Sequence, residues 1–229
     1  MEPSGETCLA VTDAHCHATC GEARHFVCSP TEAALSGRDV RFIGFHPWFL
    51  EGFDIARLRD ALERDQSAGV GEIGLDRLRS RDIPPAMREA FEAQLALAAE
   101  LRRPVILHGA KCWGEVVRAC RPFAGRIPAF LFHGFSRSEG LVPEIAAMNG
   151  FVSLGPALLN DHAVNYRAMA RRLPDGMLLV ESDRAASGPG AAAPRVGEVA
   201  AFLARLRGVP ADALAATLEA NADRFAGRP

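Results

Sequence analysis

Short apolar runs alternate along the chain with longer stretches in which apolar positions recur every three or four residues. Eight of these runs have strand length, and most are apolar throughout rather than at alternate positions. Buried strands of a parallel sheet have this pattern. The predicted strands are Cys8–Ala14, His25–Cys28, Val40–Phe45, Gly69–Leu75, Pro104–Leu107, Ala129–Phe132, Gly150–Leu154 and Met177–Glu181.

Amphipathic helices are predicted between most of these strands. Ile55, Leu58 and Leu62 share one face of a helix after the third strand. Pro84 and Pro85 begin a longer helix, because proline is tolerated in a first helical turn. Further helices are predicted at Val142–Met148, Tyr166–Leu173, Arg195–Leu206 and Pro210–Phe225.

This alternation predicts a compact, distorted (β/α)8 barrel in one α/β domain, residues 1–229. The first βα unit is expected to be shortened, because the linker between the first two strands is too short for a full helix. The segment Ala186–Pro194, rich in Gly, Pro and Ala, is interpreted as a loop after the last strand rather than as a domain linker.

Composition narrows the class of protein. Hydrophobic residues make up 48% and charged residues 24%, which is typical of a soluble globular protein. No apolar run approaches the ~18 residues of a membrane span, so no membrane partner is expected. The start of the chain lacks the features of a secretion signal, so we expect a cytoplasmic protein whose six cysteines are reduced. The net charge of −2 excludes a globally basic nucleic-acid binder but leaves room for a local basic groove.

Polar residues mark the carboxyl ends of the predicted strands, where a barrel of this kind builds its active site. Five of the seven histidines lie there, namely His15, His17, His46, His108 and His133. Glu72 lies within an apolar strand, and Asp183 follows the last one. Singly, each has a structural explanation, such as a polar loop, an ion pair, a hydrogen-bonded core histidine or a helix cap. Together they predict a centre of two divalent metal ions, with imidazoles on each ion and a carboxylate between them.

Several segments resemble, in the same order, the TatD-type metal-dependent deoxyribonucleases of the amidohydrolase superfamily. The segments are Thr12–His17, Gly44–Pro47, Gly71–Asp76, Pro104–His108, His133–Ser136, Val180–Asp183 and Asn221–Phe225. The resemblance implies a distorted TIM barrel that hydrolyses DNA phosphodiesters with the help of Zn, Mn or Mg ions.

The resemblance also implies roles for individual residues. The implied metal ligands are His15, His17, Glu72, His108, His133 and Asp183. One ion would lie with His15, His17 and Asp183, the other with His108 and His133, and Glu72 would bridge them. Asp183 would orient the attacking water and accept its proton, and Glu72 would fix the spacing of the ions, so Asp183 and Glu72 are the predicted catalytic residues. His46 would face the substrate, and Asp13 and Asp76 would support the ligands.

The loops around the site depart from the family pattern. Only 28 residues separate His17 from His46, fewer than is usual in the family, so the first helix is expected to be missing. Gly109–Trp113 replaces the usual segment after His108, and Arg184–Ala186 replaces the one after Asp183. Because the ligands are retained and the substrate loops are not, metal hydrolase chemistry is better supported than nuclease specificity.

Cationic and aromatic residues near the ligands are candidates for substrate binding. Lys111, Arg137 and Arg184 each follow a ligand and, with His46, are predicted to bind the phosphodiester. Trp48 and Trp113 either stack on a base or pack at the rim. We expect DNA ends or single strands as substrate, because a long duplex requires many phosphate contacts. A monomer or a weak dimer is expected.

Two other functions are compatible with these residues. The same metal chemistry opens lactones or cyclic amides; a lysine often bridges the ions in such relatives, but Glu72 fills that role here. The other alternative is a non-catalytic zinc-binding protein, since closed zinc sites use Cys and His ligands. Its candidate ligands are His15, Cys16, His17, Cys20, His25 and Cys28.

Overall fold

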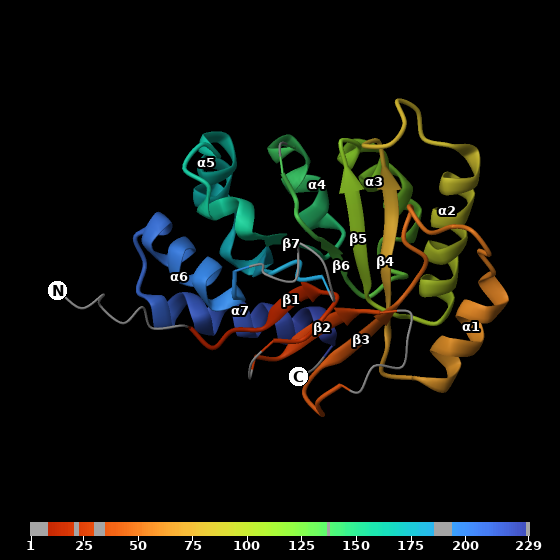
Figure 1. Ribbon diagram of the computed structural model, residues 1–229, viewed down its shortest axis with the longest axis horizontal. Helices are drawn as coiled ribbons and strands as arrows, with labels where there is room; N and C mark the ends of the chain where they lie inside the picture. The colour runs from red at the N-terminus through yellow and green to blue at the C-terminus, as the bar shows by residue number, and fades with distance from the viewer. Residues whose placement is uncertain (1–8, 21–22, 30–34, 137, 186–193, 228–229) are drawn as a thin grey trace.

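The computed structural model describes residues 9–20, 23–29, 35–136, 138–185 and 194–227. Eight strands form one sheet in which each strand pairs in parallel with the next along the chain (Figure 1). The strands are β1 (Asp13–Cys16), β2 (His25–Cys28), β3 (Val40–Ile43), β4 (Gly69–Asp76), β5 (Val105–Ala110), β6 (Phe130–Phe132), β7 (Gly150–Leu154) and β8 (Leu178–Val180). Two strands differ most from the prediction: β1 begins at Asp13 rather than Cys8, and β5 continues past His108.

The barrel closes where the segments that follow β1 and β8 meet. The amide of Asp183 donates to the carbonyl of His15 at 3.1 Å, and the amide of His17 donates to the carbonyl of Arg184 at 2.8 Å. The carboxylate of Asp13 adds a third link by accepting the amide of Ser182 at 2.9 Å. The predicted distorted (β/α)8 barrel is therefore confirmed, and residues from both ends of the chain share one side of it.

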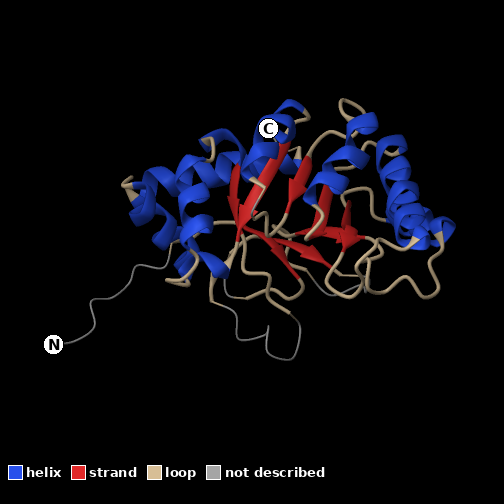
Figure 2. Ribbon diagram, turned by 90° about the horizontal axis from the view of Figure 1, so that it is seen from above, coloured by secondary structure: helices blue, strands red, loops and turns tan. Residues whose placement is uncertain are grey.

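Helices cover the outer face of the sheet (Figures 1 and 2). They are α1 (Ile55–Arg64), α2 (Pro85–Glu100), α3 (Trp113–Cys120), α4 (Val142–Ala147), α5 (Val164–Arg172), α6 (Val196–Arg207) and α7 (Ala211–Ala226). Short 3-10 turns lie at Arg121–Phe123, Glu139–Leu141, Pro156–Leu159 and Asp175–Met177. The connections β1–β2 and β2–β3 contain no helix in their described residues, in agreement with the predicted shortening.

The end of the barrel opposite the strand carboxyl ends is closed by α7. The ring of Phe225 reaches inside and contacts Phe26, Phe42 and Phe151 at centroid distances of 5.5, 5.7 and 5.8 Å. The side-chain amide of Asn221 donates to two backbone carbonyls on either side of the start of β8, at 2.6 and 2.8 Å. The closing motif Asn221–Phe225 therefore seals the barrel and lies away from the site.

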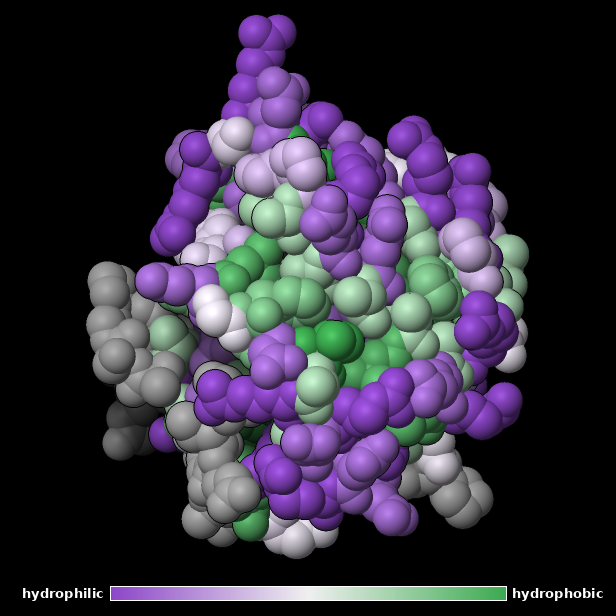
Figure 3. All heavy atoms as spheres, turned by 90° about the vertical axis from the view of Figure 1, so that its right-hand side faces the viewer, coloured by the Kyte–Doolittle hydropathy of each residue, from purple (hydrophilic) through white to green (hydrophobic). Residues whose placement is uncertain are grey.

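A second apolar core lies between the barrel and the helices. Asp54 begins α1 by accepting the amides of Ala56 and Arg57, and Pro85 occupies the first turn of α2. Seen from the side of these two helices, apolar side chains gather at the centre of the face, with polar ones around them (Figure 3). Among the described residues, no helix combines the length and the apolar character needed to cross a membrane.

Candidate metal centre

Histidine and carboxylate side chains converge on Glu72 at the carboxyl ends of the strands. The six predicted ligands meet there: His15 in β1 and His17 just after it, Glu72 in β4, His108 in β5, His133 after β6 and Asp183 after β8. Parallel strands all end on the same side of a barrel, which brings together residues that are distant in sequence.

Four donor atoms face one another on one side of Glu72. His15 Nε2 lies 3.5 Å from both Glu72 Oε2 and Asp183 Oδ1, and His17 Nε2 lies 3.5 and 3.8 Å from the same two oxygens. The corners of a tetrahedron around an ion with bonds of about 2.0–2.1 Å are about 3.3–3.4 Å apart. These four atoms are therefore spaced to hold one cation. We call His15, His17 and Asp183 the first half-site.

Contacts behind the two imidazoles prepare them for this role. His17 Nδ1 lies 3.0 Å from the carbonyl of Cys28, so Nδ1 carries the ring proton and Nε2 keeps its lone pair. His15 Nδ1 faces the Cys28 sulfur at 3.5 Å, and its buried Nε2 has no hydrogen-bond partner among the described residues. An unsatisfied buried polar atom costs about 1–3 kcal/mol. A bond from this nitrogen to a metal ion would remove that cost, so the residues present fit a divalent ion.

His108 and His133, which we call the second half-site, lie close to the other oxygen of the Glu72 carboxylate. Glu72 Oε1 lies 2.6 Å from His108 Nδ1 and 2.7 Å from His133 Nε2, and the two nitrogens are 3.3 Å apart. Asp76 Oδ2 lies 2.8 Å from His108 Nε2, which leaves Nδ1 directed at Glu72. Glu72 thus contacts one half-site with each oxygen, the geometry that a bridging carboxylate requires.

The surrounding charges keep this buried carboxylate ionised. Burial by itself would raise the pKa of Glu72, but His133, His15 and His108 lower it well below its usual range. Burial would likewise lower the pKa of His133, yet Glu72 and Glu181 raise it well above its usual value. A carboxylate within so apolar a strand needs cationic partners, which are either imidazolium groups or metal ions.

His46 lies beside the cluster and is oriented as a hydrogen-bond donor. The backbone amide of Trp48 donates to His46 Nδ1 at 3.0 Å, so the ring proton resides on Nε2, 3.6 Å from Glu72 Oε1. Burial lowers the pKa of His46 to about 4, which keeps the ring neutral at pH 7. In this tautomer the Nε2–H can donate to a substrate oxygen; His46 also belongs, with Glu72 and His108, to a group that can hold a metal ion.

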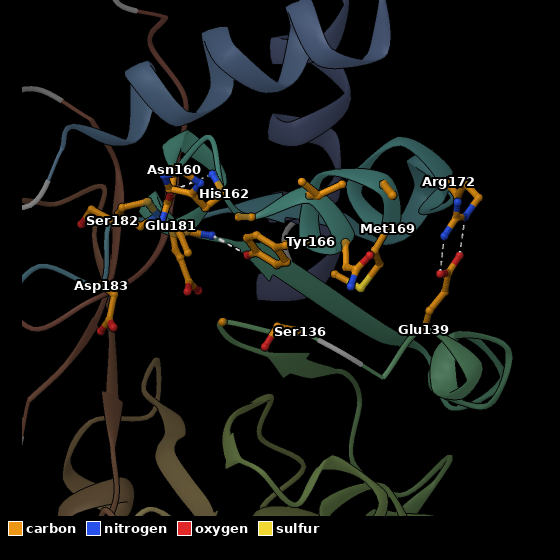
Figure 4. A pocket seen from close by; sticks show the side chains of 18 residues that line it. Ser136, Glu139, Asn160, His162, Tyr166, Met169, Arg172, Glu181, Ser182 and Asp183 are labelled. Atoms are coloured by element: carbon orange, nitrogen blue, oxygen red, sulfur yellow. Dashed lines mark hydrogen bonds and ion pairs between the residues drawn. The ribbon is translucent and has the colours of Figure 1, made fainter.

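Two cavities meet at Asp183, which lines both. The first, of about 590 Å³, is lined by Trp48 and Phe49 near His46 and by one side of α1; we call it the aromatic cavity. The second, of about 1160 Å³, extends from Asp183 towards Tyr166 on α5 and is called the α5 cavity (Figure 4). Both cavities therefore border the same predicted ligand.

The other predicted substrate-binding residues that the structure describes do not line these two cavities. Lys111 lines a separate cavity beyond the end of β5, and Arg184 lines one behind β1, because the chain turns back to β1 after Asp183. Arg137 lies outside the described residues. Trp113 is only 5% exposed and packs against Phe132, so it is a core residue rather than a platform for a base.

The described cysteines do not form the alternative zinc site. Groups of described residues that can hold a metal ion contain only His, Glu and Asp. The thiol of Cys16 donates to the carbonyl of Phe26, and Cys28 lies behind His15. Sequence reasoning named Cys28 only as a possible zinc ligand, and it did not single out Glu181, a buried carboxylate 3.6 Å from His133 Nδ1. The position of Glu181 at the end of an apolar strand was the available signal.

A comparison of the chain with models of protein families finds a match. The family model described as "TatD related DNase" matches residues 31–227. The match includes all the predicted ligands except His15 and His17, which the fold brings to the same place.

Curated relatives are similar over part of their length. The "3'-5' ssDNA/RNA exonuclease TatD" of Edwardsiella piscicida is 30% identical over 129 residues, 56% of this chain and 50% of the relative. The protein of the same name from Cronobacter sakazakii is 29% identical over 181 residues, 74% of this chain and 69% of the relative. The "Uncharacterized metal-dependent hydrolase YabD" of Bacillus subtilis is 26% identical over 144 residues, 62% and 56% of the two chains. The chain spans about half the length of the first curated relatives it matches.

Solved structures share the fold over nearly the whole chain. The TatD homologue YJJV from Escherichia coli K12 superposes with a TM-score of 0.79 at 23% identity, covering 97% of this chain and 99% of that one. A TatD family hydrolase from Entamoeba histolytica gives a TM-score of 0.74 at 11% identity, covering 96% and 99%. With most of its length matched by the family model, this chain belongs to the TatD-related DNase family.

Proposed function

We propose that the chain hydrolyses phosphodiester bonds of DNA, at ends or in single strands, with the help of two divalent metal ions. The observation that carries this proposal is Glu72, whose two oxygens contact two separate half-sites. Several relatives are named as exonucleases of single-stranded DNA and RNA, which supports the choice of substrate.

In this proposal, His15, His17 and Asp183 would hold one ion, His108 and His133 would hold the other, and Glu72 would contact both. Such ions, when bound, would supply a water of lowered pKa and charge that stabilises the entering and leaving oxygens. Imidazole and carboxylate ligands suit zinc and manganese, and magnesium prefers oxygen ligands. Metal analysis of the purified protein therefore decides the metal.

The protein's own groups divide the remaining work. The Asp183 side chain is 53% exposed where the two cavities meet, so it can contact the attacking water and accept its proton. His46 Nε2–H is placed to donate to a non-bridging phosphate oxygen. Asp76 holds His108 in one tautomer, and Asp13 ties β1 to the segment that carries Asp183.

The aromatic cavity suits a nucleic-acid substrate. The side chains of Trp48 and Phe49 are 36% and 66% exposed, and the guanidinium of Arg79 lies 4.0 Å from the centre of the Trp48 ring. Aromatic faces stack on bases regardless of sequence, and an arginine beside them adds charge for a phosphate. We propose that this cavity receives the phosphate-bearing part of the strand.

The test is to incubate the protein with Mn, Mg or Zn and end-labelled single-stranded and duplex oligonucleotides. Simple phosphodiesters, lactones and cyclic amides form the parallel panel. We expect cleavage of single strands or ends, loss of cleavage with a chelator, and no cleavage by Asp183→Asn because an amide cannot accept the proton. Turnover of a lactone or cyclic amide without cleavage of any phosphodiester would establish the amidohydrolase alternative instead.

A further inference from the structure

The α5 cavity is a second recess at the metal centre and shares Asp183 with the aromatic cavity. Its volume of about 1160 Å³ is enough for a small-molecule ligand, since such pockets measure about 300–1,000 Å³. Two glycines line its inner part, beside Glu181. A Cβ atom at Gly155 would lie 3.1 Å from Glu181 Oε1, and Gly134 has a φ of +57°, which disfavours any larger residue.

The lining offers neutral hydrogen-bonding groups. The Tyr166 hydroxyl accepts the amide of Gly155 at 3.1 Å and keeps its own proton to donate. Burial raises the pKa of Tyr166, so this hydroxyl stays protonated. Ser136 lines the cavity below Tyr166, and Asn160 lies on the opposite side (Figure 4). Neutral hydroxyl and amide groups of this kind recognise sugar hydroxyls and base edges.

The charged residues of the cavity are already paired. Arg172, at the end away from Asp183, makes two contacts of 2.6 and 2.5 Å with the Glu139 carboxylate (Figure 4). The buried Glu181 carboxylate accepts the hydroxyl of Ser153. Arg172 is the one arginine or lysine among the described lining residues and it is held by Glu139, while Glu181 and Asp183 add carboxylates, so the described lining disfavours a phosphate.

The two cavities therefore differ in what they can hold. The aromatic cavity has Arg57 in its lining and Arg79 stacked on Trp48, so it can accept negative charge. The α5 cavity offers uncharged donors and acceptors around a space of nucleoside size. We infer that the α5 cavity binds the neutral terminal nucleoside of a strand while the phosphate-bearing remainder crosses the aromatic cavity. This inference rests on the proposed function for its substrate.

Binding of a free nucleoside tests the cavity without any cleavage. Deoxyadenosine and thymidine are titrated calorimetrically into metal-loaded and metal-free wild-type protein. Ala168→Phe on α5 fills the cavity from its wall, and Ala157→Phe fills it from its rim if the first variant unfolds. Ala216→Phe is the matched control, because Ala216 is an exposed helical residue of α7 and lines none of these cavities.

We expect wild-type protein and Ala216→Phe to bind a nucleoside with equal affinity. Ala168→Phe or Ala157→Phe should weaken binding by at least about tenfold, since pocket contacts contribute about 10–200-fold to discrimination. The same variants should lose cleavage of an oligonucleotide while retaining cleavage of bis(p-nitrophenyl) phosphate, which needs only the metal centre.

The outcomes separate this inference from the proposed function. If Ala168→Phe abolishes nucleoside binding and the wild-type protein cleaves no phosphodiester, the nucleoside-binding pocket is supported and the proposed nuclease activity is refuted. Wild-type protein that cleaves oligonucleotides but binds neither nucleoside would refute the pocket and leave the nuclease standing. Equal binding by the wild type and both filled variants would also overturn the inference.

Discussion

The two ends of the barrel bury opposite kinds of side chain. At the amino end, Phe225 of α7 packs against three phenylalanines of the strands. At the carboxyl end, Glu72 is 4% exposed among histidines. Burial of apolar rings stabilises the fold, whereas a buried carboxylate costs stability unless it is paired. The comparison assigns stability to one end and chemistry to the other, and each assignment can be tested separately.

The largest effect on stability is expected at the amino end. Phe225→Ala should lower the free energy of unfolding by about 3–5 kcal/mol, because it removes a buried ring and leaves a cavity inside the barrel. Chemical denaturation measures this change, and Phe49→Ala is the control, since that ring is 66% exposed. The folded fraction of Phe225→Ala should bind metal as the wild type does. Loss of metal from that fraction would show that the two ends are not independent.

At the carboxyl end, the largest effect on activity is expected from the shared carboxylate. Glu72→Gln keeps the shape but removes the charge that both half-sites contact, so kcat/KM should fall by more than about 100-fold. Asp76→Asn is the matched control: it alters a residue behind one ligand, for which about 10–100-fold is typical. Equal losses in the two variants, with metal content intact in both, would show that Glu72 is not the bridge.

The barrel and its polar end were predictable from periodicity and strand position. Residues at the ends of parallel strands must converge, so His108 and His133 could be placed together without knowing their contacts. The features that sequence reasoning missed depend on how the chain turns after a strand. Trp113 begins α3, a helix of eight residues whose short apolar pattern gave little signal, and it packs inward. Lys111 and Arg184 follow ligands in sequence, but each lines a cavity other than the two at the metal centre.

The α5 cavity was equally inaccessible to sequence analysis. Its walls come from the loops after β6, β7 and β8 and from α5, and no motif marks the neutral character of that lining. Tyr166, the single tyrosine, was predicted only as the start of a helix. A cavity is defined by the space between elements, whereas apolar periodicity reports only the face that each element buries.

The two half-sites should differ in affinity for metal. The donor atoms of the first lie 3.5–3.8 Å apart, whereas His108 and His133 must first leave contacts of 2.6 and 2.7 Å with Glu72. One hydrogen bond to a charged group contributes about 1.5–3 kcal/mol, so the second ion should bind at least about tenfold more weakly.

Metal titration of metal-free protein, followed by calorimetry, measures the two affinities. His15→Ala with His17→Ala should remove the tighter ion, and His108→Ala with His133→Ala the weaker one. Both double variants should stay folded, because these side chains contribute little to the apolar core. If the variant with His15→Ala and His17→Ala lost the weaker ion and kept the tighter one, the assigned order of the two affinities would be wrong.

The smallest effect is expected from a residue that touches neither ion. The Trp48 indole acts as a hydrogen-bonding group that lowers the pKa of Asp76, and this carboxylate in turn holds His108 Nε2 at 2.8 Å. Trp48→Phe keeps an aromatic ring in the cavity but removes this donor, which is worth about 0.5–1.5 kcal/mol. The weaker ion should therefore lose affinity by about 2–12-fold, and the tighter ion should not change. Repeating the substitution in Asp76→Asn protein tests the route, because the effect should disappear once the carboxylate is gone. An undiminished effect in that background would mean that Trp48 acts by packing on His46 and not through Asp76.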